Sequence, residues 1–148
     1  MHPGRRVTLA EARRLADFPI RLPTVAGYDA PDAVYFRGGV PGGVVFFVYG
    51  PARAPHALLS EFESTRVEAR KIVGPGTPVE KVDVNGEPGY WFSGRPHIFV
   101  FFNRQGTFQF GTFRLATNTL VWRRGTLTYR LEAKVSQDHA VRIAESIP

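Results

Sequence analysis

The four histidines are the first residues to consider as metal-binding or catalytic groups, and they are widely spaced. They are His2, His56, His97 and His139, none has another histidine three or four residues away, and the chain contains no cysteine. Zinc sites usually take ligands from such closely spaced pairs. The sequence therefore predicts no metal and no cofactor, and the lack of cysteine excludes disulfides and thiol catalysis.

A hydrolytic site is the second candidate, and it would depend on Ser93 and His97. The chain lacks the Gly-x-Ser-x-Gly motif that presents a nucleophilic serine on a hydrolase sheet, and no acidic residue except Asp83 offers itself to orient the histidine. Gly94 and Pro96 favour a polar turn at this place instead. We therefore predict that the chain is not an enzyme.

Two further patterns have simpler explanations than chemistry. Glu61 and Glu63 would share one face of a strand, but paired carboxylates need a cleft that raises a pKa, so we interpret them as exposed carboxylates at a sheet edge. The glycine-rich stretch 38–43 lacks a following Gly-Lys-Ser/Thr and precedes a strand, so it predicts a flexible hairpin rather than a phosphate-binding loop.

The aromatic residues of segment 98–113 form the pattern that folding alone explains least well. Phenylalanines at alternate positions share one face, whereas Val100 and Phe102 fall on the other, so both faces of this part of the sheet are apolar. A filled core is one explanation, and an apolar groove for a lipid, a peptide or a partner is the other. The groove would consist of Phe99, Phe101, Phe108 and Phe110, with Arg95 and His97 of the preceding turn at its rim.

Length and composition predict one domain over residues 1–148. The chain has 148 residues, of which 43% are hydrophobic, enough for one sizeable core. Its longest apolar stretches, 44–49 and 98–102, have the length of strands, whereas a membrane-spanning helix needs roughly 20 residues. We therefore expect no membrane span in this chain.

The positive charge is scattered along the sequence. Nineteen basic residues against 13 acidic ones give a formal charge of +6, which on its own favours a polyanion as partner. The basic residues come as separate pairs at 5–6, 13–14, 70–71 and 123–124 rather than as a stripe, and acidic residues lie near several of them. We expect a generally basic surface and no specific binding of nucleic acid.

Helices are predicted at both ends of the chain and once in the middle. Thr8 and Glu11 have the spacing of a capping box, and an apolar face continues to a stop before Pro19, which predicts a helix over about 8–17. The same spacing at Thr65 and Glu68 predicts a short helix over about 66–73. After Ser136, an apolar stripe at i, i+3, i+4 and i+7 predicts a helix over about 137–147.

The rest of the chain favours strands. Segments 33–37 and 44–49 are predicted strands, the second being apolar enough to be covered on both faces. Segment 56–63 has apolar residues that suit a helix, but its neighbouring strands and turn-rich flanks favour a strand. Residues 79–132 form a meander of short strands in which Asn85-Gly86 is the clearest hairpin signal. The predicted fold is α+β, with a curved, mostly antiparallel sheet of about seven to nine strands and amphipathic helices at the N- and C-termini.

Several stretches resemble a known group of domains. They are residues 7–13 (VTLAEAR) with the following Phe18-Pro19, and residues 82–91 (VDVNGEPGYW), 93–97 (SGRPH), 115–122 (LATNTLVW), 127–132 (LTYRLE) and 143–146 (IAES). The chain resembles, over nearly its whole length, an uncharacterised family of bacterial domains common in actinobacteria. These domains form the extracytoplasmic part of single-pass membrane proteins related to anti-sigma factors, and they look akin to the curved half-barrels of periplasmic lipoprotein carriers.

The resemblance implies a non-catalytic sensor or interaction domain on the outer side of a bacterial membrane, with a possible anchor upstream in the native protein. It supplies no catalytic residues, and a cytoplasmic location stays open. Two functions therefore remain from the sequence: an extracytoplasmic sensor with a protein partner, and a carrier that holds an acyl chain or apolar peptide in a sheet groove.

Overall fold

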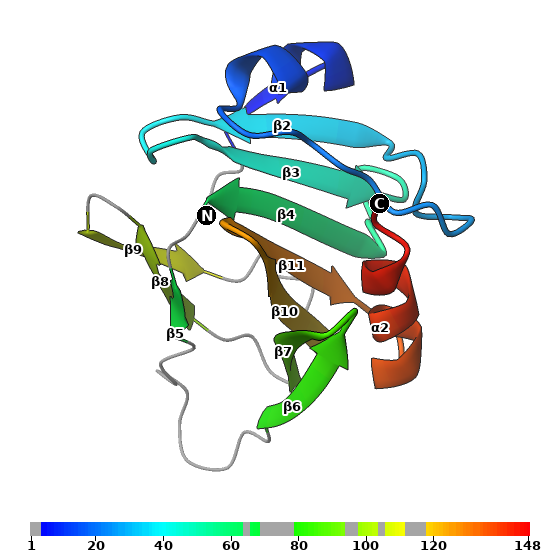
Figure 1. Cartoon of the computed structure of the whole chain (residues 1–148). Coiled ribbons are helices and arrows are strands. Elements are labelled where there is room, and N and C mark those ends of the chain that lie inside the picture. The colour runs from blue at the N-terminus through cyan, green and yellow to red at the C-terminus, as the bar shows by residue number, and fades with distance from the viewer. Residues whose placement is uncertain (1–3, 64–65, 69–78, 94–97, 104–105, 112–117) are drawn as a thin grey trace.

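The fold is built on one antiparallel sheet of eight strands (Figure 1). The structure is a computed structural model that describes residues 4–63, 66–68, 79–93, 98–103, 106–111 and 118–148. Across the sheet the strands run in the order β1 (Arg5–Val7), β2 (Ala33–Arg37), β3 (Val44–Tyr49), β4 (Ala57–Glu63), β11 (Leu127–Ala133), β10 (Asn118–Arg124), β7 (Glu87–Phe92) and β6 (Val79–Val84). This main sheet confirms the predicted α+β class and its antiparallel character.

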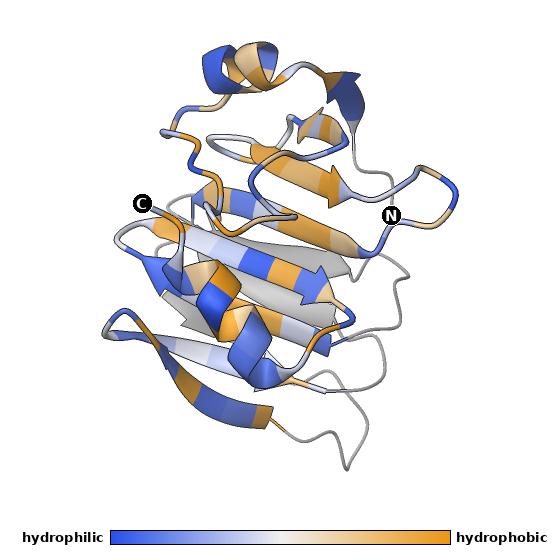
Figure 2. Ribbon diagram, turned by 90° about the vertical axis from the view of Figure 1, so that its right-hand side faces the viewer, coloured by the Kyte–Doolittle hydropathy of each residue, from blue (hydrophilic) through white to orange (hydrophobic). Residues whose placement is uncertain are grey.

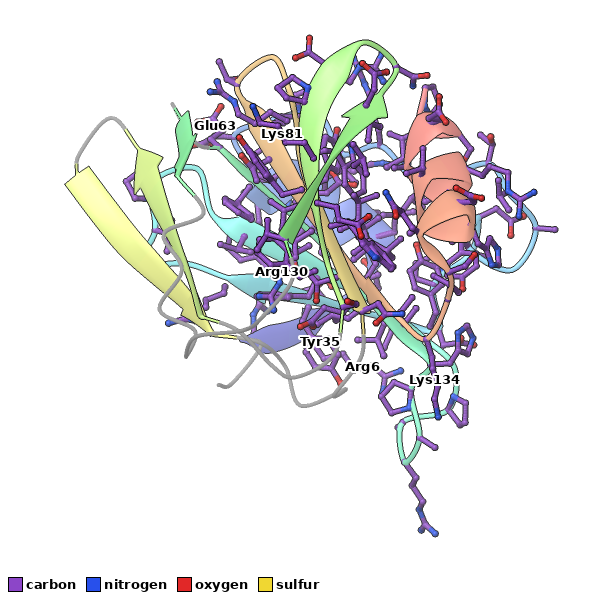
Figure 3. The ribbon with its side chains drawn as sticks, turned by 90° about the horizontal axis from the view of Figure 1, so that it is seen from below. Arg6, Tyr35, Glu63, Lys81, Arg130 and Lys134 are labelled. Carbon is purple, nitrogen blue, oxygen red and sulfur yellow. The ribbon has the colours of Figure 1, made fainter. Side chains whose placement is uncertain are left out.

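A smaller sheet of three strands, β5 (Arg66–Glu68), β8 (Ile98–Asn103) and β9 (Gly106–Gly111), is separate from the main sheet. It lies on the side of the main sheet opposite to helix α2 (Gln137–Glu145), as Figures 1 and 3 show from two directions. The described elements thus form three layers, with the main sheet in the middle.

The terminal helices begin where the sequence predicts. Helix α1 (Leu9–Leu15) has a complete capping box, because the Glu11 N–H donates to the Thr8 hydroxyl over 3.1 Å and the Thr8 N–H donates to the Glu11 carboxylate over 2.7 Å. In α2 the His139 N–H donates to the Ser136 hydroxyl over 3.2 Å. Among the described residues, no helix is long and apolar enough to cross a membrane.

The short helix predicted over 66–73 is wrong at its start. Residues Arg66–Glu68 form β5, which pairs with Val100–Phe102 of β8, and residues 69–73 lie outside the described part of the chain. A capping box is a local signal, and here pairing with a strand more than thirty residues away overrides it. Strand β1 was not predicted, because three residues are too few to show an alternating pattern.

The hairpin between β6 and β7 confirms the prediction from Asn85-Gly86. Both residues have positive φ, 53° and 84°, as a two-residue type I′ turn requires. The turn between β10 and β11 lies at Gly125 and Thr126, since β10 continues to Arg124 and Arg124 pairs with Leu127. The predicted turn at 94–97 lies outside the described residues.

The two faces of the main sheet carry two different apolar clusters. The helix face, onto which Figure 2 looks, packs against α2 and against the segment that joins α1 to β2. Its strand residues include Phe47, Leu59, Leu120, Trp122 and Leu131. The small-sheet face is the opposite one, and its cluster consists of Val44, Phe46, Leu58, Phe62, Phe92 and Val121, each exposed by no more than 4%.

We predict that α2 contributes strongly to stability through the helix face. Ile143 is fully buried, so Ile143→Ala should lower the free energy of unfolding by about 2–5 kcal/mol in urea denaturation, because it leaves a cavity. The neighbouring Arg142 is exposed, and Arg142→Ala should change stability by no more than about 0.5 kcal/mol. Equal effects of the two substitutions would contradict this packing.

Candidate functional site

The aromatic groove predicted from sequence maps to the small sheet. The register of β8 and β9 pairs Phe99 with Phe110 and Phe101 with Phe108, so the four residues occupy neighbouring positions of one hairpin, as their spacing predicted. Arg95 and His97 lie outside the described residues. The use of this face as a groove stays a prediction.

On the small-sheet face of the main sheet, strand register aligns the side chains in rows. The central row runs from strand to strand through Tyr35, Phe46, Ser60, Arg130, Val121 and Tyr90. The adjacent row contains Ala33, Val48, Leu58, Glu132, Thr119 and Phe92. Apolar side chains occupy most of both rows, and one basic and one acidic residue lie in the middle.

Arg130 and Glu132 are two residues apart on β11 and form a buried ion pair. The Arg130 Nη2 lies 2.5 Å from the Glu132 Oε1, and the two residues are exposed by only 1% and 3%. Burial raises the pKa of the Glu132 carboxyl, and the Arg130 guanidinium opposes this rise. Figure 3 shows Arg130 in the interior of the molecule. The pair compensates two charges within an apolar layer.

A cavity of about 240 Å³ opens at one end of this face. Its sheet walls come from Ala33, Val48 and Leu58 of the row that contains Glu132, together with Tyr35 and Ala57, and the loop between β3 and β4 adds proline and alanine residues. The described residues that line it include Ala33, Tyr35, Val48, Leu58, Pro51, Ala52 and Pro55. Leu58 and Val48 also pack in the apolar cluster of the small-sheet face, so the cavity continues that cluster toward the sheet edge.

Arg6 and Asp32 are the charged residues among the described lining of this cavity. Arg6 is exposed on the edge strand β1 and pairs in register with Tyr35, beside which Figure 3 shows it. The Asp32 Oδ2 accepts a hydrogen bond from the Gly50 N–H over 2.6 Å, which fixes the start of the loop between β3 and β4. The cavity thus combines apolar walls with one basic side chain at its edge.

Two other hollows are found among the described residues. One of about 480 Å³ lies between β1, β2 and the preceding segment, is more open than the first cavity, and shares Arg6, Asp32 and Ala33 with it. The other, of about 290 Å³, lies between the C-terminal end of α2 and two hairpins, and polar side chains such as Asn85, Glu87 and Arg123 line much of it.

Glu61 overturns the expectation of an exposed edge carboxylate. Strand β4 is central, lying between β3 and β11, so Glu61 is fully buried, whereas Glu63 at the strand end is half-buried. The Glu61 Oε2 accepts a hydrogen bond from the Arg21 N–H over 3.3 Å. Desolvation raises the pKa of Glu61 to about 8, and the hydrogen bond and nearby arginines only partly offset it. The alternation of Glu61 and Glu63 in the sequence shows that they share a strand face, but not that β4 is a central strand whose faces are covered.

Two buried tyrosines of the helix face, Tyr129 and Tyr49, have pKa values that the Glu61 carboxyl helps to raise. Tyr129 lies directly opposite Glu61 in the pairing of β4 with β11 and stacks on Trp122 with ring centroids 5.2 Å apart. Desolvation, and then the Glu61 charge, raise the pKa of Tyr129 to about 12. The pKa of Tyr49 is raised by the same two causes. These groups stay uncharged near neutral pH, as their apolar surroundings require.

The remaining candidates from the sequence have structural roles where they are described. The Asp83 Oδ1 accepts a hydrogen bond from the Gly86 N–H over 2.9 Å, which stabilises the hairpin turn. His56 and His139 both make edge-to-face contacts with Tyr28, at centroid distances of 6.0 and 6.1 Å. In the described part of the chain, no three metal-binding side chains come together.

The buried Glu61 predicts that stability falls as the pH rises. Its pKa is about 8 in the folded protein against 4.5 as the ordinary value, so between these values the folded state binds the extra proton. The contribution of Glu61 is therefore complete below about pH 4.5 and declines toward pH 8, by up to about 1.4 kcal/mol per pH unit. Urea denaturation from pH 5 to 8.5 measures this slope.

Glu61→Gln should reduce that dependence and make the protein more stable than wild type at pH 8, because a buried amide is uncharged without taking up a proton on folding. The slope that remains is that of Glu132, whose pKa is also raised. Glu63→Gln, on the same strand and the same face, is the matched control and should keep the wild-type slope. Identical slopes for wild type and Glu61→Gln would contradict the burial of a titrating carboxyl.

The ion pair predicts non-additive mutations. Replacing Arg130 alone by Met leaves the buried Glu132 carboxylate without its guanidinium partner and should cost about 3–5 kcal/mol at pH 8. The double variant Arg130→Met/Glu132→Met should regain most of that loss, since both charges are removed together. A double-mutant cycle in urea measures the coupling, and simple addition of the two single effects would contradict it.

Comparison of the chain with models of protein families, with curated protein sequences and with solved structures gives no match.

Proposed function

We propose that this chain is a non-catalytic binding domain that takes an aliphatic ligand into the cavity beside β2, β3 and β4. One observation carries the proposal: the cavity has apolar walls and shares Val48 and Leu58 with the buried cluster of the small-sheet face. An aliphatic chain that enters it replaces water at apolar surface, which favours binding by about 25 cal/mol per Å² of area buried.

The resemblance described above supports a sensor role for such binding. In this proposal the domain lies on the outer side of a bacterial membrane, and occupation of the cavity is the signal that a protein partner reads. The loop between β3 and β4 is the element that would transmit it, because Pro51, Ala52 and Pro55 line the cavity and residues 51–54 are also exposed to a partner. A carrier role would use the same cavity without a partner.

The proposal is tested with the uncharged probe N-phenyl-1-naphthylamine, whose fluorescence rises in apolar surroundings. We expect saturable binding to the wild-type chain. Val48→Phe places a larger side chain in the cavity wall and should weaken probe binding at least about tenfold, as expected when a ligand of this size loses its apolar contacts.

Val79→Phe is the matched control, because it introduces the same ring at an exposed position on the edge strand β6. It should leave probe affinity unchanged, and the melting temperatures of both variants should be measured to confirm that they fold. No saturable binding by the wild-type chain, or equal effects of the two variants, would exclude this cavity as the ligand site.

A further inference from the structure

We propose that the ligand of this cavity is an aliphatic carboxylate, whose carboxylate is bound by Arg6 at the edge while its chain extends between Val48 and the loop prolines. This inference rests on the proposed function and adds the chemical class of the ligand. It follows from the position of Arg6 at the cavity edge, from the hydrogen bonds that tie Asp32 to the loop backbone, and from the apolar walls at Val48 and Leu58.

Arg6 is placed to meet a ligand at the boundary between water and apolar surface. It is exposed and lines the cavity, and its register partner Tyr35 belongs to the small-sheet face. A guanidinium presents paired N–H donors that match the two oxygens of a carboxylate. An anionic head at Arg6 therefore keeps contact with water, and only the chain is desolvated.

Asp32 does not replace Arg6 as the recognition group. Its Oδ2 already accepts the Gly50 N–H over 2.6 Å, and its own N–H donates to the Val48 carbonyl over 2.8 Å, so this residue is committed to the backbone of the loop. The formal charge of +6 on the whole chain also favours an anionic ligand over a cationic one.

The inner end of the cavity requires an apolar end of the ligand. Leu58 forms the wall there, and its register partner on the next strand is Glu132, about one strand spacing of 4.8 Å away. Glu132 does not line the cavity and its charge is already paired with Arg130, so the wall at Leu58 and Val48 offers a carboxylate no polar partner and the ligand enters chain first. The volume of about 240 Å³ suits a short or medium chain.

The neighbouring Arg5 provides a control for the change in net charge. Arg5 and Arg6 are consecutive and both exposed, but Arg5 pairs with Phe36, which packs against the cluster of the helix face. The two side chains therefore lie on opposite faces of β1. Arg5→Gln and Arg6→Gln change the net charge equally, so they separate a direct contact from general electrostatic attraction.

The experiment compares decanoate with 1-decanol, which has the same chain length and no charge. Both are titrated against the wild-type chain and the variants by displacement of N-phenyl-1-naphthylamine, with isothermal titration calorimetry as a direct measurement. We expect Arg6→Gln to weaken decanoate binding about threefold to tenfold, as for an ion pair at a partly exposed site, and to leave 1-decanol unchanged. Arg6→Lys should retain part of the preference for decanoate over 1-decanol, and Arg5→Gln should retain all of it.

The other possible results separate an error in the Arg6 contact from an error in the proposed function. If Arg5→Gln weakens decanoate as much as Arg6→Gln, or if Arg6→Gln has no effect, the contact with Arg6 is wrong while the apolar site stands. If the wild-type chain binds the probe and 1-decanol but not decanoate, the inference of a carboxylate ligand is wrong, whereas the proposed apolar site stands. If the wild-type chain binds neither the probe nor either ligand, the proposed function itself is wrong.

Discussion

The pairing of β4 with β11 in the middle of the main sheet is the constraint on which the rest of the structure depends. Every residue of β11 is buried, and every residue of β4 except the last, so both faces of the sheet need a cover. On one face, α2 and the segment after α1 supply it. The other face is buried on the side where the small sheet lies, so the three layers follow from two central strands that water cannot reach.

That constraint also explains the ionisable groups of the core. An ionisable side chain on a central strand cannot reach solvent, so its charge must be paired within the core or the group must be neutral. Arg130 and Glu132 achieve this by pairing with each other on one face. Glu61, on the other face, takes one backbone N–H and a raised pKa instead. Both carboxyls keep a raised pKa, about 7 for Glu132 and about 8 for Glu61, so both faces of the same strand pair contribute to a stability that falls as the pH rises.

The cavity lies where the loop between β3 and β4 meets the ends of these strands. Pro51, Ala52 and Pro55 of this loop line it together with Val48 and Leu58. The short edge strand β1 then brings Arg6 to this opening. Arg6 at the boundary with water and the wall residues Val48 and Leu58 are thus more than forty residues apart in the chain.

The sequence by itself determined the elements whose signals are local. The capping residues Thr8 and Ser136, the turn at Asn85-Gly86 and the apolar run of β3 each specify a few bonds or torsion angles within a short stretch, and each prediction from them was confirmed. Tertiary structure decided what depends on neighbours far away in the chain. Residues Arg66–Glu68 became a strand because β8 lies beside them, and Glu61 became buried because β11 lies beside β4. The place of Arg6 at a cavity likewise depends on β2 and on a loop after β3, and periodicity reports which face a residue occupies but not what covers that face.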